Sequence, residues 1–164
     1  MKSKALFITQ AAVIAAIYVV LTYLAQLFGL ASGAIQLRLS EMLTVLPFFT
    51  PAAIPGLFIG CVLSNILTGC VIWDVIFGSL ATLIGAVGTY LLRKKSPYLA
   101  PVPPIVANTL IVPFVLTYAY GAEDGILFLM LTVGIGEILS CGVLGIVFMK
   151  ALTPVKNRLF QQQN

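Results

Sequence analysis

The sequence predicts an all-α membrane protein, a compact bundle of six transmembrane helices with both termini in the cytoplasm. The chain is 60% hydrophobic and 9% charged over its 164 residues, whereas an ordinary soluble domain is about 25% charged. A soluble core of this size could not bury so much apolar surface. The few charges lie between long uncharged runs, which are the lengths that membrane-crossing helices need. Because no polar linker divides these runs, residues 1–164 are expected to form one integral-membrane domain.

Four of the uncharged runs each match a single transmembrane helix, which needs about 20 apolar residues. The first run follows Lys2 and Lys4, and the last is interrupted only by Glu137. The helices expected from these runs are 5–29, 75–92, 98–119 and 126–149.

The run 42–73 is ambiguous, because its 32 residues are long for one span and short for two. We interpret it as two short helices that turn near residues 50–51, since proline removes a backbone donor and clashes with the preceding turn. Three prolines fall in this region, namely Pro47, Pro51 and Pro55. One kinked helix is the alternative.

The positions of the basic residues favour two short helices. Basic residues collect on the cytoplasmic side of membrane proteins. With two helices in the 42–73 run, all nine Lys and Arg residues except Arg38 fall on the side of the N-terminus. With one helix, the cluster 93–95 and the C-terminal basic residues would lie opposite Lys2 and Lys4. The charge pattern therefore predicts cytoplasmic termini and an external Arg38.

The residue types that are missing argue against an enzyme. The chain has no histidine, so a histidine base or histidine metal ligand is impossible. Its cysteines, Cys61, Cys70 and Cys141, are scattered and form no C-x-x-C pair. No G-x-x-x-x-G-K-[ST] phosphate-binding loop occurs, and no nucleophile stands beside a base. We expect a binding or transport protein without metal, cofactor or nucleic-acid partner, which takes its energy from elsewhere.

The segment "IQLRLSEM" at 35–42 keeps two opposite charges between apolar runs. Its apolar and polar residues alternate, which is typical of an extended segment with two faces. Ser40 is a reasonable N-cap for the helix that follows, with Glu41 in its first turn, where the helix dipole favours an anion. Two interpretations remain open: an Arg38–Glu41 ion pair that fixes a loop, or a lid whose polar face looks into a cavity.

Glu137 is a candidate ligand-binding residue near the middle of the last helix. An ionisable group at that depth is costly, so it is expected to face the interior of the bundle and mark a functional site. Gly134, Ser140 and Cys141 share its face and are small, which would leave room around it. A structural hydrogen bond to a neighbouring helix is the alternative.

Further polar residues point to the same outer half of the bundle. Asp74 begins the fourth expected helix beside Trp73, and Asn65 and Asn108 are buried amides. The alternatives are a dipole partner for Asp74 and interhelical hydrogen bonds for the amides. Carboxylates suit a ligand with N–H donors or a cationic amine, and aromatic side chains suit a flat ring. A planar, nitrogen-rich heterocycle fits this inventory better than a sugar, a lipid or an inorganic ion.

The first helix carries pairs of small residues four positions apart. Such small-xxx-small pairs let another helix approach closely. The pairs are Ala11 with Ala15 and Ala12 with Ala16. They are candidates for a partner interface, and internal packing is the alternative.

Two segments and these alanine pairs resemble the QueT family. The segments are "QLRLSEMLTVLPFFTPAAIPGLFIGC" and "WDVIFGSLATL", and the resemblance extends over nearly the whole chain. It implies a substrate-specificity subunit (S component) of an energy-coupling factor (ECF) transporter in the plasma membrane of a prokaryote. The ligand implied is a queuosine precursor, namely a 7-deazaguanine base in its aminomethyl form or queuine. The implied partners are a transmembrane coupling subunit, which docks on the helix-one alanines, and two ATPase subunits.

Under this resemblance, the candidate residues acquire expected roles. Glu137 is expected to bind the ring edge, Asp74 or Glu41 the cation, and Trp73 the ring face. Arg38 would pair with Glu41 or donate to the ring carbonyl. Two other functions remain open, namely uptake of another flat nutrient such as a vitamin or tryptophan, and a membrane scaffold without a ligand.

Overall fold

The computed structural model describes residues 2–31 and 35–160, and every regular element in this part of the chain is helical. The α-helices are α1 (Lys2–Leu27), α2 (Ala53–Leu67), α3 (Ile72–Leu92), α4 (Val102–Ala119), α5 (Ile126–Glu137), α6 (Gly145–Leu152) and α7 (Lys156–Leu159). The 3-10 helices are η1 (Leu39–Phe48), η2 (Pro97–Leu99) and η4 (Thr153–Val155), and η3 (Ile138–Leu144) is a π-helix.

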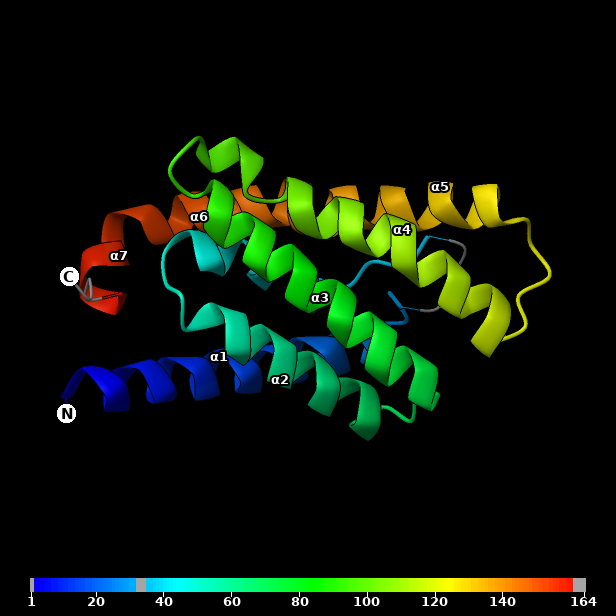
Figure 1. The fold of residues 1–164 in the computed structure, drawn as a ribbon, viewed down its shortest axis with the longest axis horizontal. Helices are drawn as coiled ribbons and strands as arrows, with labels where there is room; N and C mark the ends of the chain where they lie inside the picture. The colour runs from blue at the N-terminus through cyan, green and yellow to red at the C-terminus, as the bar shows by residue number, and fades with distance from the viewer. Residues whose placement is uncertain (1, 32–34, 161–164) are drawn as a thin grey trace.

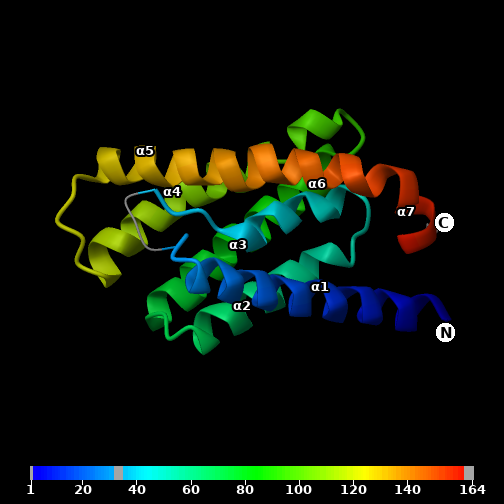
Figure 2. The ribbon, with the colours of Figure 1, turned by 180° about the vertical axis from the view of Figure 1, so that it is seen from behind.

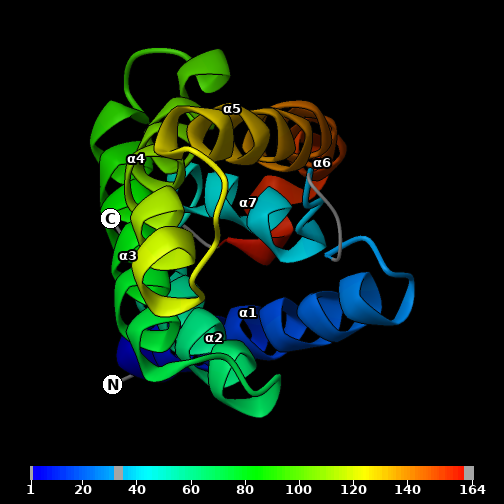
Figure 3. The ribbon, with the colours of Figure 1, turned by 90° about the vertical axis from the view of Figure 1, so that its right-hand side faces the viewer.

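The helices pack along one long axis, with both described ends of the chain at one end of the bundle (Figure 1). α1 packs on α2, α2 on α3, α3 on α4, and α4 on α5. The segment from α5 through η3 to α6 forms one continuous rod along the bundle (Figure 2). Seen along the axis, η1 lies inside the ring of longer helices (Figure 3), and it contacts α1, α2, α3, η3 and α6. The apolar and small residues of η1 therefore form much of the core, among them Leu43, Val45 and Leu46.

Within residues 2–31 and 35–160, four helical stretches are long and apolar enough to cross a membrane, and two apolar helices are shorter. The long stretches are Lys4–Leu27, Ile72–Leu92, Pro97–Ala119 and Ile126–Val155, and the shorter helices are η1 and α2. The run 42–73 is thus divided, with a break over residues 49–52 between η1 and α2. The alternative of one kinked helix is wrong. Proline explains the break, since Pro51 lies in the turn between the two helices. The hydroxyl of the neighbouring Thr50 stabilises the turn by accepting a hydrogen bond from the Ala52 amide at 3.3 Å.

The prediction that Ser40 is the N-cap of the helix after segment 35–38 is also wrong. η1 begins at Leu39, so Ser40 lies inside the helix, and no side chain caps the amides at its start. The Ser40 hydroxyl instead accepts a hydrogen bond from Thr22 of α1 at 3.0 Å. Only residues 35–38 of the expected extended segment are non-helical. Glu41 does lie in the first turn, as expected.

Small residues set the contact between α1 and α2. A Cβ atom added at Gly56 would lie 2.8 Å from the carbonyl oxygen of Ala11, and one at Gly60 would lie 3.1 Å from the Cα of Ala15. The two helices can approach this closely only because both glycines lack side chains. The Ala11–Ala15 pair is therefore used for packing within the chain.

Candidate functional site

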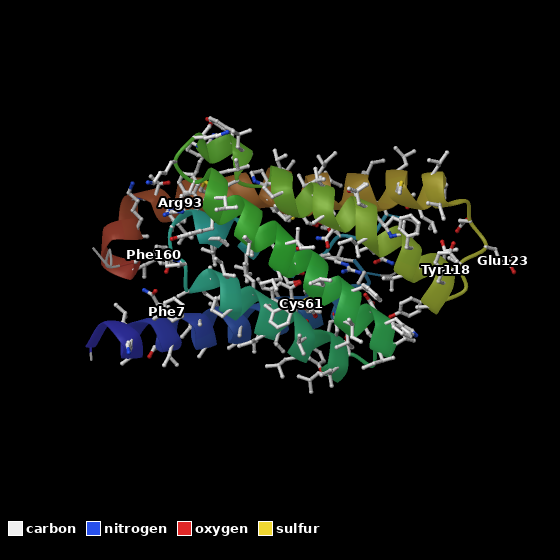
Figure 4. The ribbon with its side chains drawn as sticks, viewed as in Figure 1. Phe7, Cys61, Arg93, Tyr118, Glu123 and Phe160 are labelled. Atoms are coloured by element: carbon white, nitrogen blue, oxygen red, sulfur yellow. The ribbon has the colours of Figure 1, made fainter. Side chains whose placement is uncertain are left out.

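A polar cavity of about 330 Å³ lies at the end of the bundle opposite the described termini. It is enclosed by the second half of α1, segment 35–38, the start of η1, the end of α2, the start of α3 and the end of α4. Figure 4 marks the two ends, with Tyr118 and Glu123 at the cavity end and Arg93 and Phe160 at the other. The side chains that line the cavity include Tyr18, Thr22, Gln26, Gln36, Arg38, Ser40, Ser64, Asn65, Thr68, Cys70, Asp74 and Tyr120.

Arg38 and Gln36 separate this cavity from Glu137. Both line the polar cavity, and both also line a small void of about 10 Å³ that contains Glu137. The segment that carries them is held in place from two sides. The Arg38 amide donates to the Ser140 hydroxyl at 3.1 Å, and the Leu37 amide donates to the Leu30 carbonyl at 2.8 Å.

The space around Glu137 is filled by the chain itself. The carbonyl oxygen of Gln36 packs against Gly136 so closely that a Cβ atom there would overlap it. Ser140 is bonded to the backbone of segment 35–38, and the Cys141 thiol donates to the Glu137 carboxylate at 3.1 Å. The small residues near Glu137 therefore accommodate this segment and η1, where the sequence suggested open space.

Glu41 is buried in a hydrogen-bond network and makes no ion pair with Arg38, both residues being among those described. Its Oε1 accepts from the Tyr18 hydroxyl at 2.5 Å, and its Oε2 accepts from the Asn108 amide at 3.4 Å. Glu41 and Asn108 are each 1% exposed. The ion-pair interpretation is wrong because helix formation at Leu39 turns Glu41 inward toward α1 and α4, while Arg38 stays in the segment at the cavity wall.

Arg38 is the positive charge among three acidic side chains. Burial by itself lowers the pKa of its guanidinium, but attraction by Asp74, Glu137 and Glu41 raises that pKa above its ordinary value. The guanidinium is therefore a permanent cation, which balances part of the negative charge of this region.

Asp74 forms a second polar corner of the cavity. It is 6% exposed and lies in the first turn of α3. Its Oδ2 accepts from the Tyr120 hydroxyl at 2.9 Å, and the Asn65 amide donates to its backbone carbonyl at 3.3 Å. Within the described part of the chain, its buried Oδ1 has no hydrogen-bond partner.

The structure does not bring Trp73 into the cavity. Successive residues of an α-helix point about 100° apart, so Trp73 faces outward when Asp74 faces inward. Trp73 is 55% exposed and lies over an apolar groove between α3 and α4. The aromatic side chains at the cavity are instead Tyr18 and Tyr120.

One cluster has the composition of a metal site. Ligand atoms of Glu41, Glu137 and Cys141 lie within 4.8 Å of one another. Hydrogen bonds account for this proximity, since the Cys141 thiol donates to Glu137 and the Thr44 hydroxyl donates to Cys141 at 3.3 Å. We infer no metal at this cluster.

The two alanine pairs of α1 have different surroundings. Ala11 and Ala15 are buried against α2, whereas Ala12 and Ala16 are exposed. All four alanines line an apolar groove of about 480 Å³ between α1 and α2, which also includes Ile59. A partner helix in this groove would meet the exposed Ala12 and Ala16, whereas Ala11 and Ala15 also pack against α2.

The sequence interpretation omitted Tyr18 and Gln36 from the site. Tyr18 is 3% exposed and is one of two tyrosines in the apolar run of α1, the other being Tyr23. Gln36 was not named as a ligand-binding residue, but it belongs to the polar face of the alternating segment 35–42, and that face was the signal.

A profile of the QueT transporter family matches residues 8–154, which include both segments of the resemblance described above. The chain belongs to the QueT transporter family. A family of transporters agrees with the long apolar helices and points away from an enzyme.

One curated relative is "Queuosine precursor transporter QueT" of Lactococcus lactis subsp. cremoris (strain MG1363). It is 43% identical to this chain over 83 residues, which are 51% of this chain and 48% of the relative. The match thus covers about half the length of this QueT protein. No solved structure matches the chain significantly.

Proposed function

We propose that this chain is the substrate-binding S component of an ECF-type importer and captures a queuosine precursor from outside the cell. The observation that carries the proposal is the polar cavity of about 330 Å³ in a chain of this transporter family. Pockets for small ligands have volumes of about 300–1,000 Å³, so the cavity suits a small planar base. The relative's name supplies the class of substrate.

The charge at the two ends of the bundle supports an orientation with both termini in the cytoplasm. Lys4 at the start of α1, the cluster 93–95 after α3, and Lys150 in α6 are at the end with the termini. Positive charge concentrates on the cytoplasmic side. With η1 and α2 counted as short membrane segments, the chain would have six such segments. The cavity would then face the outside of the cell, and the protein would lie in the plasma membrane of a prokaryote.

The polar groups match the edges of a 7-deazaguanine base. Arg38 at the cavity wall is suited to donate to the ring carbonyl, and Glu137 behind it is suited to accept from the ring N–H and exocyclic amine. In the loaded state that we propose, Arg38 turns toward the ring carbonyl and segment 35–38 opens the way to Glu137. Tyr18 and Tyr120 take the stacking role expected of Trp73. Asn65 contacts the ligand directly, and Asn108 orients Glu41.

The expected partners follow from the surface and from the motifs. The groove at Ala12 and Ala16 would receive a helix of the transmembrane coupling subunit. Two ATPase subunits would supply the energy, since the chain has no phosphate-binding loop of its own.

The test is calorimetric titration of the purified protein in detergent with three bases, namely aminomethyl 7-deazaguanine, queuine and guanine. We expect tight binding of a deazaguanine. Glu137→Gln is expected to weaken it at least about tenfold, which corresponds to about 1.4 kcal/mol. Glu123→Gln, at the exposed loop before α5, is the matched control and should bind like the wild type.

The outcomes separate substrate from site. Tight binding that Glu137→Gln leaves unchanged would keep the substrate and move the ring-edge contact to Glu41. Failure of folded wild-type protein to bind any of the three bases would overturn the substrate, and vitamins and tryptophan would be tried next.

A further inference from the structure

Asp74 has a carboxylate oxygen that nothing in the described chain satisfies. Three buried side-chain oxygens in the described part lack a hydrogen-bond partner, and they belong to Asp74, Ser79 and Thr109. Of these residues, Asp74 is the one that lines the polar cavity. Leaving a buried polar group unpaired is costly, and the cost is greater for a charged group. This oxygen is itself enclosed by the protein, so Asp74 presents the cavity wall with a carboxylate that hydrogen bonds satisfy only in part.

The other two acids are less available to a ligand. Both oxygens of Glu41 are used, one by Tyr18 and one by Asn108. Glu137 is bonded to Cys141 and lies behind the wall formed by Gln36 and Arg38. Asp74 is thus the acid that lines the cavity and keeps an oxygen without a hydrogen-bond partner.

The surroundings of Asp74 hold it in position. Tyr120 donates to Oδ2 at 2.9 Å, which leaves Oδ1 as the free acceptor. Burial and the Asp74 carboxylate raise the pKa of Tyr120, so the phenol stays protonated and keeps donating. Oδ1 lies beside Gly78, where a Cβ atom would come within 2.8 Å of it. The absence of a side chain at Gly78 therefore makes the space that this oxygen occupies.

We propose that the Asp74–Tyr120 corner is a cation subsite that receives a protonated aliphatic amine of the ligand. This inference rests on the proposed function and narrows its substrate class. The amine would donate to the Asp74 carboxylate in a charge-assisted hydrogen bond, which is stronger than a neutral one. The protein therefore selects 7-deazaguanines with an aminomethyl group, free or substituted, over neutral ones such as the nitrile.

The test compares two bases that share one ring and differ in charge, aminomethyl 7-deazaguanine and 7-cyano-7-deazaguanine. Affinities are measured by calorimetry on wild type, Asp74→Asn and Asp124→Asn, with thermal unfolding as the check of folding. Asp74→Asn keeps the volume and an acceptor for Tyr120 but removes the charge. Asp124, in the exposed loop before α5, provides the matched control.

We expect the wild type to prefer the aminomethyl base at least about tenfold. Asp74→Asn should remove that preference by weakening the binding of the aminomethyl base alone. Asp124→Asn should change the affinity for neither base. Equal affinities of the wild type for both bases would overturn the subsite while keeping the proposed function, and this comparison needs no variant. Equal loss for both bases in Asp74→Asn would also overturn it. Failure of both bases to bind folded wild type would instead overturn the proposed function, and the subsite with it.

Discussion

The hydroxyl of Tyr18 in α1 donates to Oε1 of Glu41 in η1 at 2.5 Å, and both side chains are buried. This bond joins the first helix to the 3-10 helix in the middle of the bundle. It also satisfies one oxygen of a carboxyl group whose other oxygen is held by Asn108 of α4. The polar core beside the cavity therefore depends on three segments meeting at one side chain.

Tyr18→Phe is expected to lower the free energy of unfolding by about 1.5–3 kcal/mol, because a hydrogen bond to a charged group is lost and a buried oxygen is left unpaired. Thermal or denaturant unfolding in detergent measures the effect. Tyr23→Phe is the matched control, since the Tyr23 hydroxyl donates to the Leu67 carbonyl at 3.1 Å at an exposed position. Equal stability of Tyr18→Phe and Tyr23→Phe would contradict the role of Tyr18.

Gly136→Ala is expected to displace segment 35–38, because the new methyl group would overlap the Gln36 carbonyl oxygen. Overpacking of this kind costs about 1–3 kcal/mol, and we expect weaker ligand binding as well. Gly134→Ala on the same helix is the control, since the atoms nearest to its Cβ lie at 3.5 Å, an ordinary contact. Unfolding measurements and ligand titrations are made on both variants. Equal stability and equal ligand affinity of Gly136→Ala and Gly134→Ala would refute the close contact between Gly136 and Gln36.

Cys70 is expected to be the thiol that a maleimide labels first. It is partly exposed and lines the polar cavity, whereas Cys61 and Cys141 are 2% and 0% exposed. A bound ligand should slow the labelling of Cys70, because it would fill the space that the reagent must enter. Mass spectrometry of the labelled protein with and without aminomethyl 7-deazaguanine measures this. Cys70→Ser should abolish the fast reaction, and fast labelling that persists in Cys70→Ser would show that the cavity is not the reactive site.

Replacing Ala12 and Ala16 together by leucine is expected to prevent assembly with the coupling subunit and leave ligand binding unchanged. Both residues line the exposed groove between α1 and α2, and larger side chains would fill it. Co-purification with the coupling subunit and titration of the isolated protein measure the two properties. Val13→Leu, at a residue of α1 that is 52% exposed and outside the groove, is the control. Normal assembly of the double variant would place the partner elsewhere.

The local properties of the sequence were sufficient for the elements of the fold. Hydropathy and charge are carried by each segment alone, so the long runs predicted the four long helices. Proline acts on its own turn, which is why the break between η1 and α2 could be placed near residue 50. The burial of Glu137 also followed from the cost of an ionisable group inside a membrane protein.

The partners of those groups were decided by the tertiary structure. Arg38 bonds through its amide to Ser140, 102 residues away, and Tyr18 reaches Glu41, 23 residues away. Sequence proximity suggested an Arg38–Glu41 pair, but the hydrogen bonds of the Glu41 carboxylate go to Tyr18 and Asn108 on other helices. Bonds between distant segments depend on how helices rotate and pack against each other, and the residue types alone do not specify that rotation. The sequence by itself therefore determined a membrane protein with a buried acid in its last helix, and only the packing decided that Asp74 lines the cavity while Trp73 faces away.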